Sequence, residues 1–224
     1  MLSLTVVVVA TRPGPYDRRA VRVLASTLPT GVAALAVAAS YLVGTFPTAV
    51  LVARRRGVDP TREGSGNPGA TNVLRVAGRR AGAAALAGDV AKGAVPAAVG
   101  WAVGGHGLGV ACGVAAVVGH VLPVTRRFRG GKGVATEAGM AVVLFPAASA
   151  VAVAGFAAAV VISRAASLGS MVATVLLPVA AAGFGAPGRE VAALAGCAAL
   201  IVFRHRDNIS RLRRGTERRL GGRD

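Results

Sequence analysis

The stretch FRGGKGVATEAGMAVVLF, residues 128–145, joins a basic glycine-rich turn directly to an apolar segment. Nucleotide-binding P-loops follow the pattern G-x-x-x-x-G-K-[ST], in which backbone N–H groups and the lysine bind phosphate. Here Gly133 follows Lys132, and the glycine spacing of that pattern is missing. The apolar run that follows is typical of a membrane helix. The stretch therefore predicts a phosphate-binding loop at the edge of a membrane.

The composition of the whole chain also favours a membrane protein. Of its 224 residues, 54% are hydrophobic and only 4% are aromatic, which is too apolar for an ordinary soluble domain. The formal net charge of +17 could suggest nucleic acid. However, the basic residues fall into three clusters, and the apolar segments between them are about long enough to cross a bilayer. We therefore expect no nucleic-acid partner. The clusters span residues 54–80, 126–132 and 204–223.

The order of apolar segments and basic clusters predicts a topology. Loops rich in Lys and Arg tend to stay cytoplasmic, so the three clusters should share that side. An even number of crossings must then separate each cluster from the next, which requires Pro146 to divide the longest apolar segment into two helices. We expect an all-α, polytopic integral membrane helical bundle of about seven transmembrane helices, with the N-terminus outside and the C-terminus cytoplasmic. The apolar segments are 31–53, 81–103, 108–124, 134–162, 168–185 and 190–203.

Residues 1–30 do not fit this topology, because they carry four arginines in front of a helix that should enter from outside. We expect them to be an N-terminal extension, either disordered or an artefact of the assigned start site. Residues 31–220 should form a single membrane domain, followed by a tail at 221–224. His106 and Pro187 should lie near the outer face. The two cysteines and three histidines are widely spaced, so we expect no metal and no cofactor.

The first basic cluster contains GSGNPGATNVLR, residues 64–75. Its glycines and proline favour an irregular backbone with N–H groups that suit an anion, and a helix starting near Ala70 would add its positive end. Thr71, Arg75 and Arg79 recur at i, i+4 and i+8, which would place them along one side of a helix. An ordinary polar turn with a helix cap is the alternative. The further candidate phosphate ligands here are Ser65, Gly66, Asn67 and Asn72.

In the second cluster, Lys132 is the best candidate for a charge contact with phosphate, surrounded by the N–H groups of Gly130, Gly131 and Gly133. A juxtamembrane basic segment that contacts anionic lipid headgroups is the alternative. That alternative explains the neighbouring arginines but not the glycines.

The third cluster, FRHRDNISRLRRGTERR at residues 203–219, places His205, Asn208 and Arg211 at intervals of three on a predicted helix. Glu217 could anchor an arginine. A basic amphipathic segment lying on the membrane surface is the alternative. Asp89 and Lys92 form a further pair at i, i+3 within an apolar segment, where charges are costly and are usually paired or functional.

Taken together, GSGNPGATNVLR, GHVLPVTRRFRGGKGVAT and HRDNISRLRRGTE resemble, in order and spacing, the three signature motifs of the bacterial membrane acyl-phosphate:glycerol-3-phosphate acyltransferases, the PlsY family. The resemblance covers about residues 35–220 and includes SYLVGTFP, GDVAKG and SLGS between the motifs. Two features depart from the family pattern. VTRRF is less apolar than usual, and Glu137 is not expected after VAT.

The resemblance implies transfer of a fatty acyl group from acyl phosphate to the 1-hydroxyl of sn-glycerol 3-phosphate, giving lysophosphatidic acid and phosphate. It implies a multi-pass protein of the bacterial plasma membrane with the motif loops on the cytoplasmic side. Its partners would be the two substrates and membrane lipids, with the soluble enzyme that makes acyl phosphate as a further candidate. By motif matching, the catalytic residues would be Ser65, Arg75, Lys132, His205 and Asn208, with Thr136 among the phosphate ligands and Asp89, Lys92, Arg211 and Glu217 in support.

Several alternatives stay open at the level of sequence. The H-x-x-x-x-D pair of acyl-CoA-type acyltransferases is absent, so the base could be His205 or the phosphate of the acceptor itself. A small membrane transporter of a phosphorylated solute would also need a polar pocket in a helical bundle. Such carriers usually contain inverted repeats, and the sequence shows none. A structural protein that binds lipid headgroups is a third reading.

Overall fold

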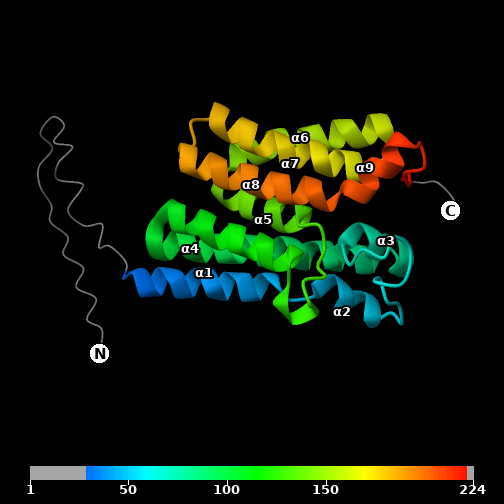
Figure 1. The fold of residues 1–224 in the computed structure, drawn as a ribbon, viewed down its shortest axis with the longest axis horizontal. Helices are drawn as coiled ribbons and strands as arrows, with labels where there is room; N and C mark the ends of the chain where they lie inside the picture. The colour runs from blue at the N-terminus through cyan, green and yellow to red at the C-terminus, as the bar shows by residue number, and fades with distance from the viewer. Residues whose placement is uncertain (1–28, 221–224) are drawn as a thin grey trace, which may run out of the picture.

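The computed structural model describes residues 29–220, and these contain helices and no strands. Figure 1 shows the long helices lying side by side along one axis. This confirms the expected all-helical architecture, whereas the expectations for residues 1–28 and 221–224 fall outside the described residues. The helices are α1 (Thr30–Gly44), α2 (Thr48–Arg54), α3 (Ala70–Ala77), α4 (Arg79–Val121), the 3₁₀ helix η2 (Val124–Arg126), α5 (Val134–Leu144), α6 (Pro146–Ser163), α7 (Ala166–Gly183), α8 (Gly188–Arg204) and α9 (Arg206–Arg213).

The long helix α4 consists of two antiparallel helices joined by a sharp turn. Gly104 and Gly105 have non-helical backbone angles, and Gly105 has φ of 79°, a value that glycine adopts readily. The turn confirms the two segments expected at 81–103 and 108–124. The second half ends at Val121 rather than at 124, because Pro123 cannot continue a helix.

The expectation of one continuous helix over 31–53 was wrong. The chain ends α1 at Gly44 and begins α2 at Thr48. Pro47 lacks a backbone N–H and disfavours helical geometry at Phe46, so the helix breaks there. The break exposes the carbonyl oxygen of Phe46, which accepts a hydrogen bond of 3.1 Å from Nζ of Lys92.

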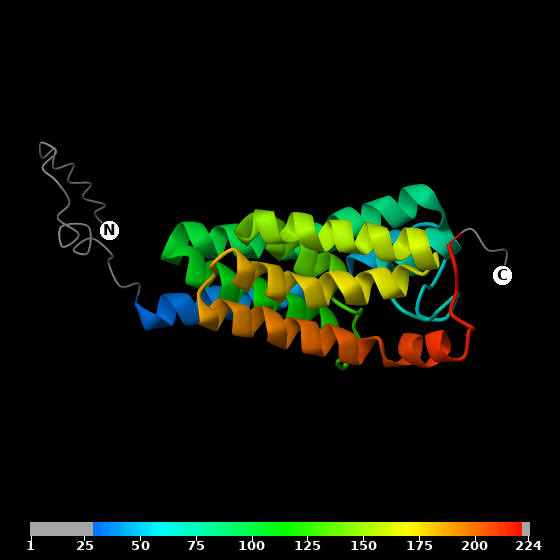
Figure 2. The same cartoon turned by 90° about the horizontal axis from the view of Figure 1, so that it is seen from above.

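The apolar segment 134–162 is divided at Pro146, as expected. Phe145, with φ of −135° and ψ of 59°, separates α5 from α6. Figure 2 shows that α7 then runs antiparallel to both α6 and α8, with α9 continuing beyond the end of α8.

Close approach of the helices depends on small residues. A methyl group at Gly93 of α4 would overlap the carbonyl oxygen of Thr136, and one at Gly139 of α5 would overlap that of Val90. Small residues at such contacts let helix backbones approach closely, which is how helices associate in membranes.

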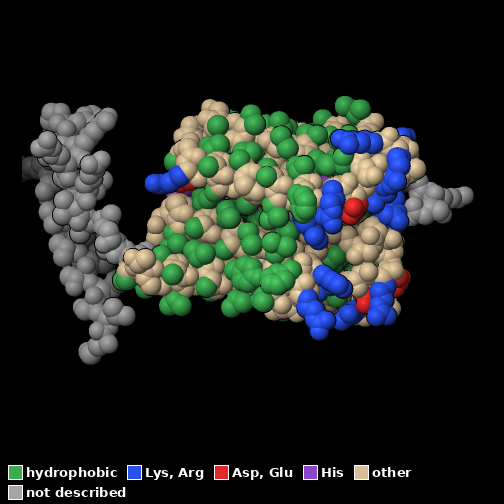
Figure 3. Space-filling view, in the orientation of Figure 1, with side chains coloured by type: hydrophobic (Ala, Val, Ile, Leu, Met, Phe, Trp, Pro, Cys, Tyr) green, Lys and Arg blue, Asp and Glu red, His purple; other side chains and the backbone are tan. Residues whose placement is uncertain are grey.

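The outer surface of the bundle is apolar, which is the arrangement expected of a protein surrounded by lipid. Figure 3 shows hydrophobic side chains over the middle of the molecule and most of the visible lysines and arginines at one end, near α2, α3 and α9. Ile162 is 85% exposed and Val161 is 79% exposed. By length and composition, four helices could cross a membrane among the described residues: Thr30–Arg54, Arg79–Arg126, Pro146–Ser163 and Ala166–Gly183.

Candidate active site

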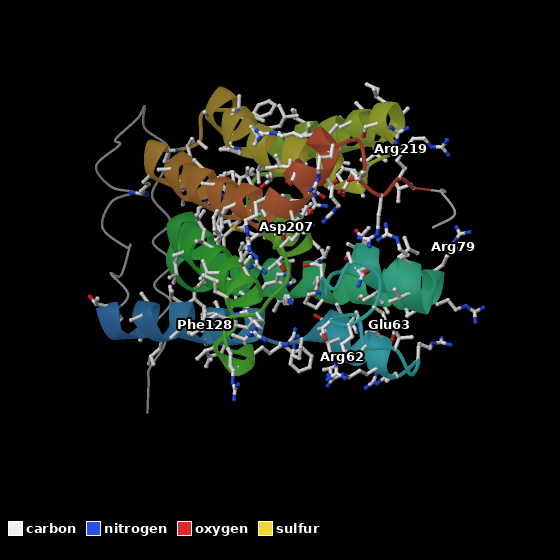
Figure 4. The ribbon with its side chains drawn as sticks, turned by 45° about the vertical axis from the view of Figure 1, so that its right-hand side comes forward. Arg62, Glu63, Arg79, Phe128, Asp207 and Arg219 are labelled. Carbon is white, nitrogen blue, oxygen red and sulfur yellow. The ribbon has the colours of Figure 1, made fainter. Side chains whose placement is uncertain are left out.

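A single cavity of about 680 Å³ joins the three motif segments at the charged end of the molecule. Figure 4 shows this end, where Glu63, Phe128 and Asp207 lie on or beside the first, second and third motif segments. The cavity continues between the helices, where small apolar and aromatic side chains of α5, α6 and α7 line it. Its polar lining includes Ser65, Asn67, Thr71, Arg75, Lys132, His205, Asn208, Arg211 and Glu217. The cavity therefore has two parts, a polar head at the three motif segments and an apolar region between the helices.

Asn72 organises the first motif loop from within. Its side chain is buried, and its Nδ2 donates to the carbonyl oxygens of Pro60 at 2.9 Å and Glu63 at 3.0 Å. Its Oδ1 accepts the N–H of Ser65 at 2.9 Å. Because both amide hydrogens are engaged, the side chain of Asn72 supports the loop that holds Ser65 at the cavity, rather than offering a free donor to phosphate.

Gly66 likewise stabilises the loop and does not line the cavity. Its N–H donates to the carbonyl oxygen of Glu63 at 3.1 Å, and the residue is not part of the cavity lining. The expected site residues Ser65 and Asn67 do line the cavity. The first loop thus contributes mainly side chains and the start of α3.

Helix α3 begins at Ala70, as predicted, but the expectation that it would carry Arg79 was wrong. Gly78 has φ of 86° and ψ of 174°, which ends α3 and lets α4 begin at Arg79. Thr71 and Arg75 therefore share α3, whereas Arg79 belongs to the next helix. All three side chains still line the cavity, because the two helices meet at its edge.

Only part of the glycine-rich loop faces the main cavity. Gly133 and Lys132 line it, whereas Gly130 and Gly131 line a smaller neighbouring pocket. A methyl group at Gly131 would overlap the ring of His120, and the N–H of Gly131 donates to the carbonyl oxygen of His120 at 3.1 Å. These two glycines therefore allow the loop to pack closely on His120.

One further contact to the same loop comes from the end of α8. Arg204 donates to the carbonyl oxygen of Gly130 at 3.1 Å. Thr136, a sequence candidate for phosphate binding, is fully buried in the first turn of α5 and does not line the cavity. Gly133 adopts φ of 97° and precedes the first turn of α5. The loop thus presents Lys132 to the cavity from a backbone that its neighbours fix.

Glu217 connects the third motif to Lys132. Its carboxylate accepts hydrogen bonds from Asn208 at 2.6 Å, Arg211 at 2.8 Å and Ser167 at 2.8 Å. Burial alone would raise the pKa of Glu217, but the hydrogen bonds from Ser167, Asn208 and Arg211 outweigh it and lower the pKa. Because the Asn208 amide donates to Glu217, its Oδ1 is turned to accept a hydrogen bond from Nζ of Lys132.

The pKa of the Lys132 ammonium group lies closer to neutral pH than that of an ordinary lysine. Burial lowers the pKa of Lys132 to about 8, although the negative charge of Glu217 opposes this shift. A lysine in this environment is charged at neutral pH and lies against a polar cavity, which suits contact with an anion.

His205 lies between α8 and α9, not within one helical continuation as the sequence suggested. Its ring is buried, and Nδ1 lies 2.8 Å from the carbonyl oxygen of Ile201. Because a carbonyl only accepts, Nδ1 carries the hydrogen and Nε2 keeps a lone pair. Burial and, after it, the positive charge of Lys132 lower the pKa of His205 to about 4. The ring is therefore neutral near neutral pH and can accept a proton.

The intramembrane charges predicted as a pair do interact. Nζ of Lys92 lies 2.8 Å from Oδ1 of Asp89, and the hydroxyl of Thr48 donates to the same oxygen at 2.7 Å. The ring of His120 lies 3.8 Å away. Because Gly131 packs on His120 and donates to its carbonyl oxygen, this buried cluster also supports the glycine-rich loop.

Of the C-terminal strap, residues 214–220, sequence reasoning named Glu217 but missed the residues that close the cavity. The N–H of Leu220 donates to the carbonyl oxygen of Arg164 at 2.7 Å, and Arg218 donates to that of Gly64 at 3.3 Å. Both residues line the cavity, so the strap closes it between the first loop and the α6–α7 corner. Ser167 was also missed, although the SLGS segment that contains it was part of the resemblance.

Comparison with known proteins identifies the family. A family model described as glycerol-3-phosphate acyltransferase matches residues 34–215. A glycerol-3-phosphate acyltransferase of Rubrobacter xylanophilus is 44% identical over 190 residues, covering 84% of this chain and 96% of the relative. One from Pseudomonas aeruginosa is 47% identical over 188 residues, covering 80% of this chain and 95% of the relative.

Solved structures agree with the sequence matches. The crystal structure of PlsY, an integral membrane glycerol 3-phosphate acyltransferase, in its glycerol 3-phosphate form has a TM-score of 0.81 and 35% sequence identity. It covers 85% of this chain and 96% of the solved chain. The lysophosphatidic acid form of the same protein gives a TM-score of 0.80. The chain therefore belongs to the PlsY family of integral membrane glycerol-3-phosphate acyltransferases.

Proposed function

We propose that this protein transfers a fatty acyl group from acyl phosphate to the 1-hydroxyl of sn-glycerol 3-phosphate and releases lysophosphatidic acid and inorganic phosphate. The observation that carries the proposal is the cavity itself, which joins a cationic polar head to an apolar passage between helices. An acyl phosphate has the same two parts. The names of the family relatives, and the two ligand forms of the solved PlsY, support the acceptor and the product.

The polar head contains enough cationic groups for two phosphates. Lys132, Arg75 and Arg79 line it from the second loop, α3 and α4, and Arg211 and Arg218 line it from the third motif and the strap. One phosphate belongs to the donor and leaves during the reaction, and the other belongs to the acceptor and stays. The glycine-rich loop presents Lys132 beside the leaving phosphate, whose negative charge grows as the bond to the acyl carbon breaks.

The reaction needs no covalent enzyme intermediate. The 1-hydroxyl oxygen attacks the carbonyl carbon, the bond between that carbon and the bridging phosphate oxygen breaks, and phosphate leaves with the electron pair. The hydroxyl proton passes to Nε2 of His205 or to the phosphate of the acceptor. A mixed anhydride has a good leaving group, so the protein contributes chiefly orientation and anion stabilisation.

The proposed arrangement in the membrane follows from the two ends of the molecule. The motif loops, rich in arginine and lysine, would face the cytoplasm of a bacterial cell, and the Gly104–Gly105 turn would face outward. With α4 counted as two helices and the short helices α2 and α3 left out, the helices from α1 to α8 would make seven crossings. The acyl chain would lie among α5, α6 and α7, level with the hydrocarbon of the bilayer.

The test is product formation by the purified full chain in detergent. With acyl phosphate and glycerol 3-phosphate, mass spectrometry should detect lysophosphatidic acid without ATP, coenzyme A or divalent metal, and EDTA should leave the rate unchanged. Acyl-CoA should be a poor donor, because a thioester lacks the phosphate that Lys132 is proposed to contact. Efficient use of acyl-CoA, or a strict metal requirement, would contradict the proposed donor site.

A further inference from the structure

One arginine connects the second motif to the third without lining the cavity. Arg204 is the last residue of α8 and directly precedes His205. Its Nη2 donates a hydrogen bond of 3.1 Å to the carbonyl oxygen of Gly130, which stands two residues before Lys132. The side chain of Arg204 therefore acts on the glycine-rich loop and not on a substrate.

The same loop is attached to α4. The N–H of Gly131 donates to the carbonyl oxygen of His120 at 3.1 Å, and a methyl group at Gly130 would overlap that oxygen. The loop backbone thus packs directly on α4. Because Arg204 belongs to α8, the loop is held by two different helices.

A second hydrogen bond joins the loop to the segment that follows α8. Asn208, four residues after Arg204, accepts a hydrogen bond from Nζ of Lys132. The two bonds meet the loop at Gly130 and at Lys132, and His205 lies between their other ends, at the junction of α8 and α9. Together they determine how the loop is placed against the segment that carries His205.

The two bonds differ in how a bound substrate would affect them. The bond between Lys132 and Asn208 involves an ammonium group that a phosphate would also contact. The bond from Arg204 ends on a backbone oxygen, and neither Arg204 nor Gly130 lines the main cavity. This bond can therefore remain while the cavity is filled. Such placement matters for catalysis, because a displacement of about 1 Å can reduce a rate by about 100-fold.

We propose that Arg204 is a positioning residue, which holds the glycine-rich loop so that Lys132 keeps a fixed place relative to His205. Arginine suits this role, because its guanidinium presents several N–H donors in a rigid plane and stays charged. The residue lies just outside the motif HRDNISRLRRGTE, which begins at His205. The proposal rests on the acyl-phosphate reaction proposed above.

The first test is kcat of purified variants in detergent, with acyl phosphate and glycerol 3-phosphate. Arg204→Met keeps an apolar stem and removes every donor, so kcat should fall by about 10- to 100-fold, as expected for a displaced group. Arg204→Lys should recover most of this loss, because its ammonium can donate to the same carbonyl oxygen. Elution on size exclusion checks folding. Should Arg204→Met fail to fold, Arg204→Leu is measured by the same criteria.

Arg206→Ala is the matched control. Arg206 is an exposed arginine close to Arg204 in sequence, it does not line the cavity, and its guanidinium lies 5.1 Å from the centre of the Phe203 ring. Its removal takes away the same charge at the same helix junction, so kcat should stay close to that of the unmodified chain.

A double variant distinguishes positioning of Lys132 from general support of the fold. If Arg204 acts through Lys132, adding Arg204→Met to Lys132→Ala should reduce kcat by no more than about 3-fold beyond Lys132→Ala alone. A residue that only stabilises the fold would cause the same loss in both backgrounds.

The inference and the proposed reaction fail differently. Normal kcat in Arg204→Met, no recovery in Arg204→Lys, an equal loss in Arg206→Ala or a full further loss in the double variant would each overturn the inference and leave the reaction intact. Absence of product from the unmodified chain with every acyl phosphate would overturn the proposed reaction, and the inference with it.

Discussion

At the scale of single residues, the head of the cavity depends on how Asn208 is oriented. Its amide donates to Glu217 on one side and accepts from Lys132 on the other. Because its amide is bonded on both sides, Asn208 positions the ammonium group of Lys132 without neutralising its charge. The carboxylate of Glu217 lies on the other side of Asn208 from the lysine. The ammonium charge of Lys132 thus remains directed toward the cavity, where the proposed leaving phosphate lies.

Lys132→Ala should leave the protein folded but reduce kcat by about 100- to 1000-fold, the usual effect of removing one group that stabilises developing negative charge. Lys132→Arg should keep part of the activity, since it keeps the charge but not the compact shape. The measurement is turnover of acyl phosphate, with elution on size exclusion as the folding check.

Arg129→Ala is the matched control, because Arg129 is an exposed cation of the same loop that does not line the cavity. Near-normal turnover in Lys132→Ala, or an equal loss in Arg129→Ala, would favour the alternative in which this loop only contacts lipid headgroups.

The pH dependence of kcat/KM should report the titration of Lys132. Its pKa is lowered to about 8, so the charged form predominates below that pH and is lost above it. If the charge is needed, kcat/KM should fall as the pH rises through about 8. In Lys132→Arg the guanidinium stays charged, so the fall should disappear from that window. A fall of the same size in both proteins would assign it to another group.

Several residue roles could be predicted from the sequence, and several could not. Lys132, Asn208 and Glu217 were recognised from composition, spacing and resemblance, and the structure brings them together. Asn72 and Gly131 are of residue types that often bind phosphate, but here their hydrogen bonds go to backbone groups and stabilise the loops. Their partners, Glu63 and His120, are fixed by the three-dimensional course of the loops, which spacing alone does not encode.

At the scale of helices, the contact between α4 and α5 supports the glycine-rich loop, because α5 begins at the end of that loop. Gly93 and Gly139 let the two backbones meet. Without a hydrophobic driving force between helices in lipid, such close packing is a main source of association.

Gly139→Ala should therefore lower thermal stability in detergent. The added methyl group would overlap the carbonyl oxygen of Val90, and overpacking of this kind costs about 1–3 kcal/mol. Gly196→Ala in α8 is the matched control, since nothing lies within 4 Å of an added methyl group and alanine favours the helix. The measurement is the unfolding temperature of each purified variant. An equal shift in both would contradict the packing argument.

The breaks at Pro146 and at the Gly104–Gly105 turn were predictable, because proline or glycine marks them and the order of the basic clusters requires them. The break at Pro47 was missed because the order of the basic clusters, which required the division at Pro146, requires none there. The break at Gly78 was missed because an i, i+4, i+8 pattern persists when two helices meet at a glycine. Hydrophobic periodicity indicates where helices occur, whereas backbone geometry decides where each one ends.

At the scale of the whole molecule, the charged end and the Gly104–Gly105 end should lie on opposite sides of the membrane. Single cysteines introduced at Gly66 and Gly215 should resist impermeant reagents applied to intact cells, and one at Pro187 should react. The native Cys112 and Cys197 are buried, so they should give little background. Permeabilised cells provide the control, in which all three positions should react. Strong labelling from outside at Gly66 or Gly215 would contradict the proposed orientation.

The central claim is that one cavity holds an acyl phosphate and glycerol 3-phosphate together. The most direct measurement is release of inorganic phosphate by the purified protein in detergent, followed alongside lysophosphatidic acid. We expect rapid release only when both substrates are present, with one phosphate for each lysophosphatidic acid formed. Release that is independent of glycerol 3-phosphate, or no release with both substrates, would contradict the account.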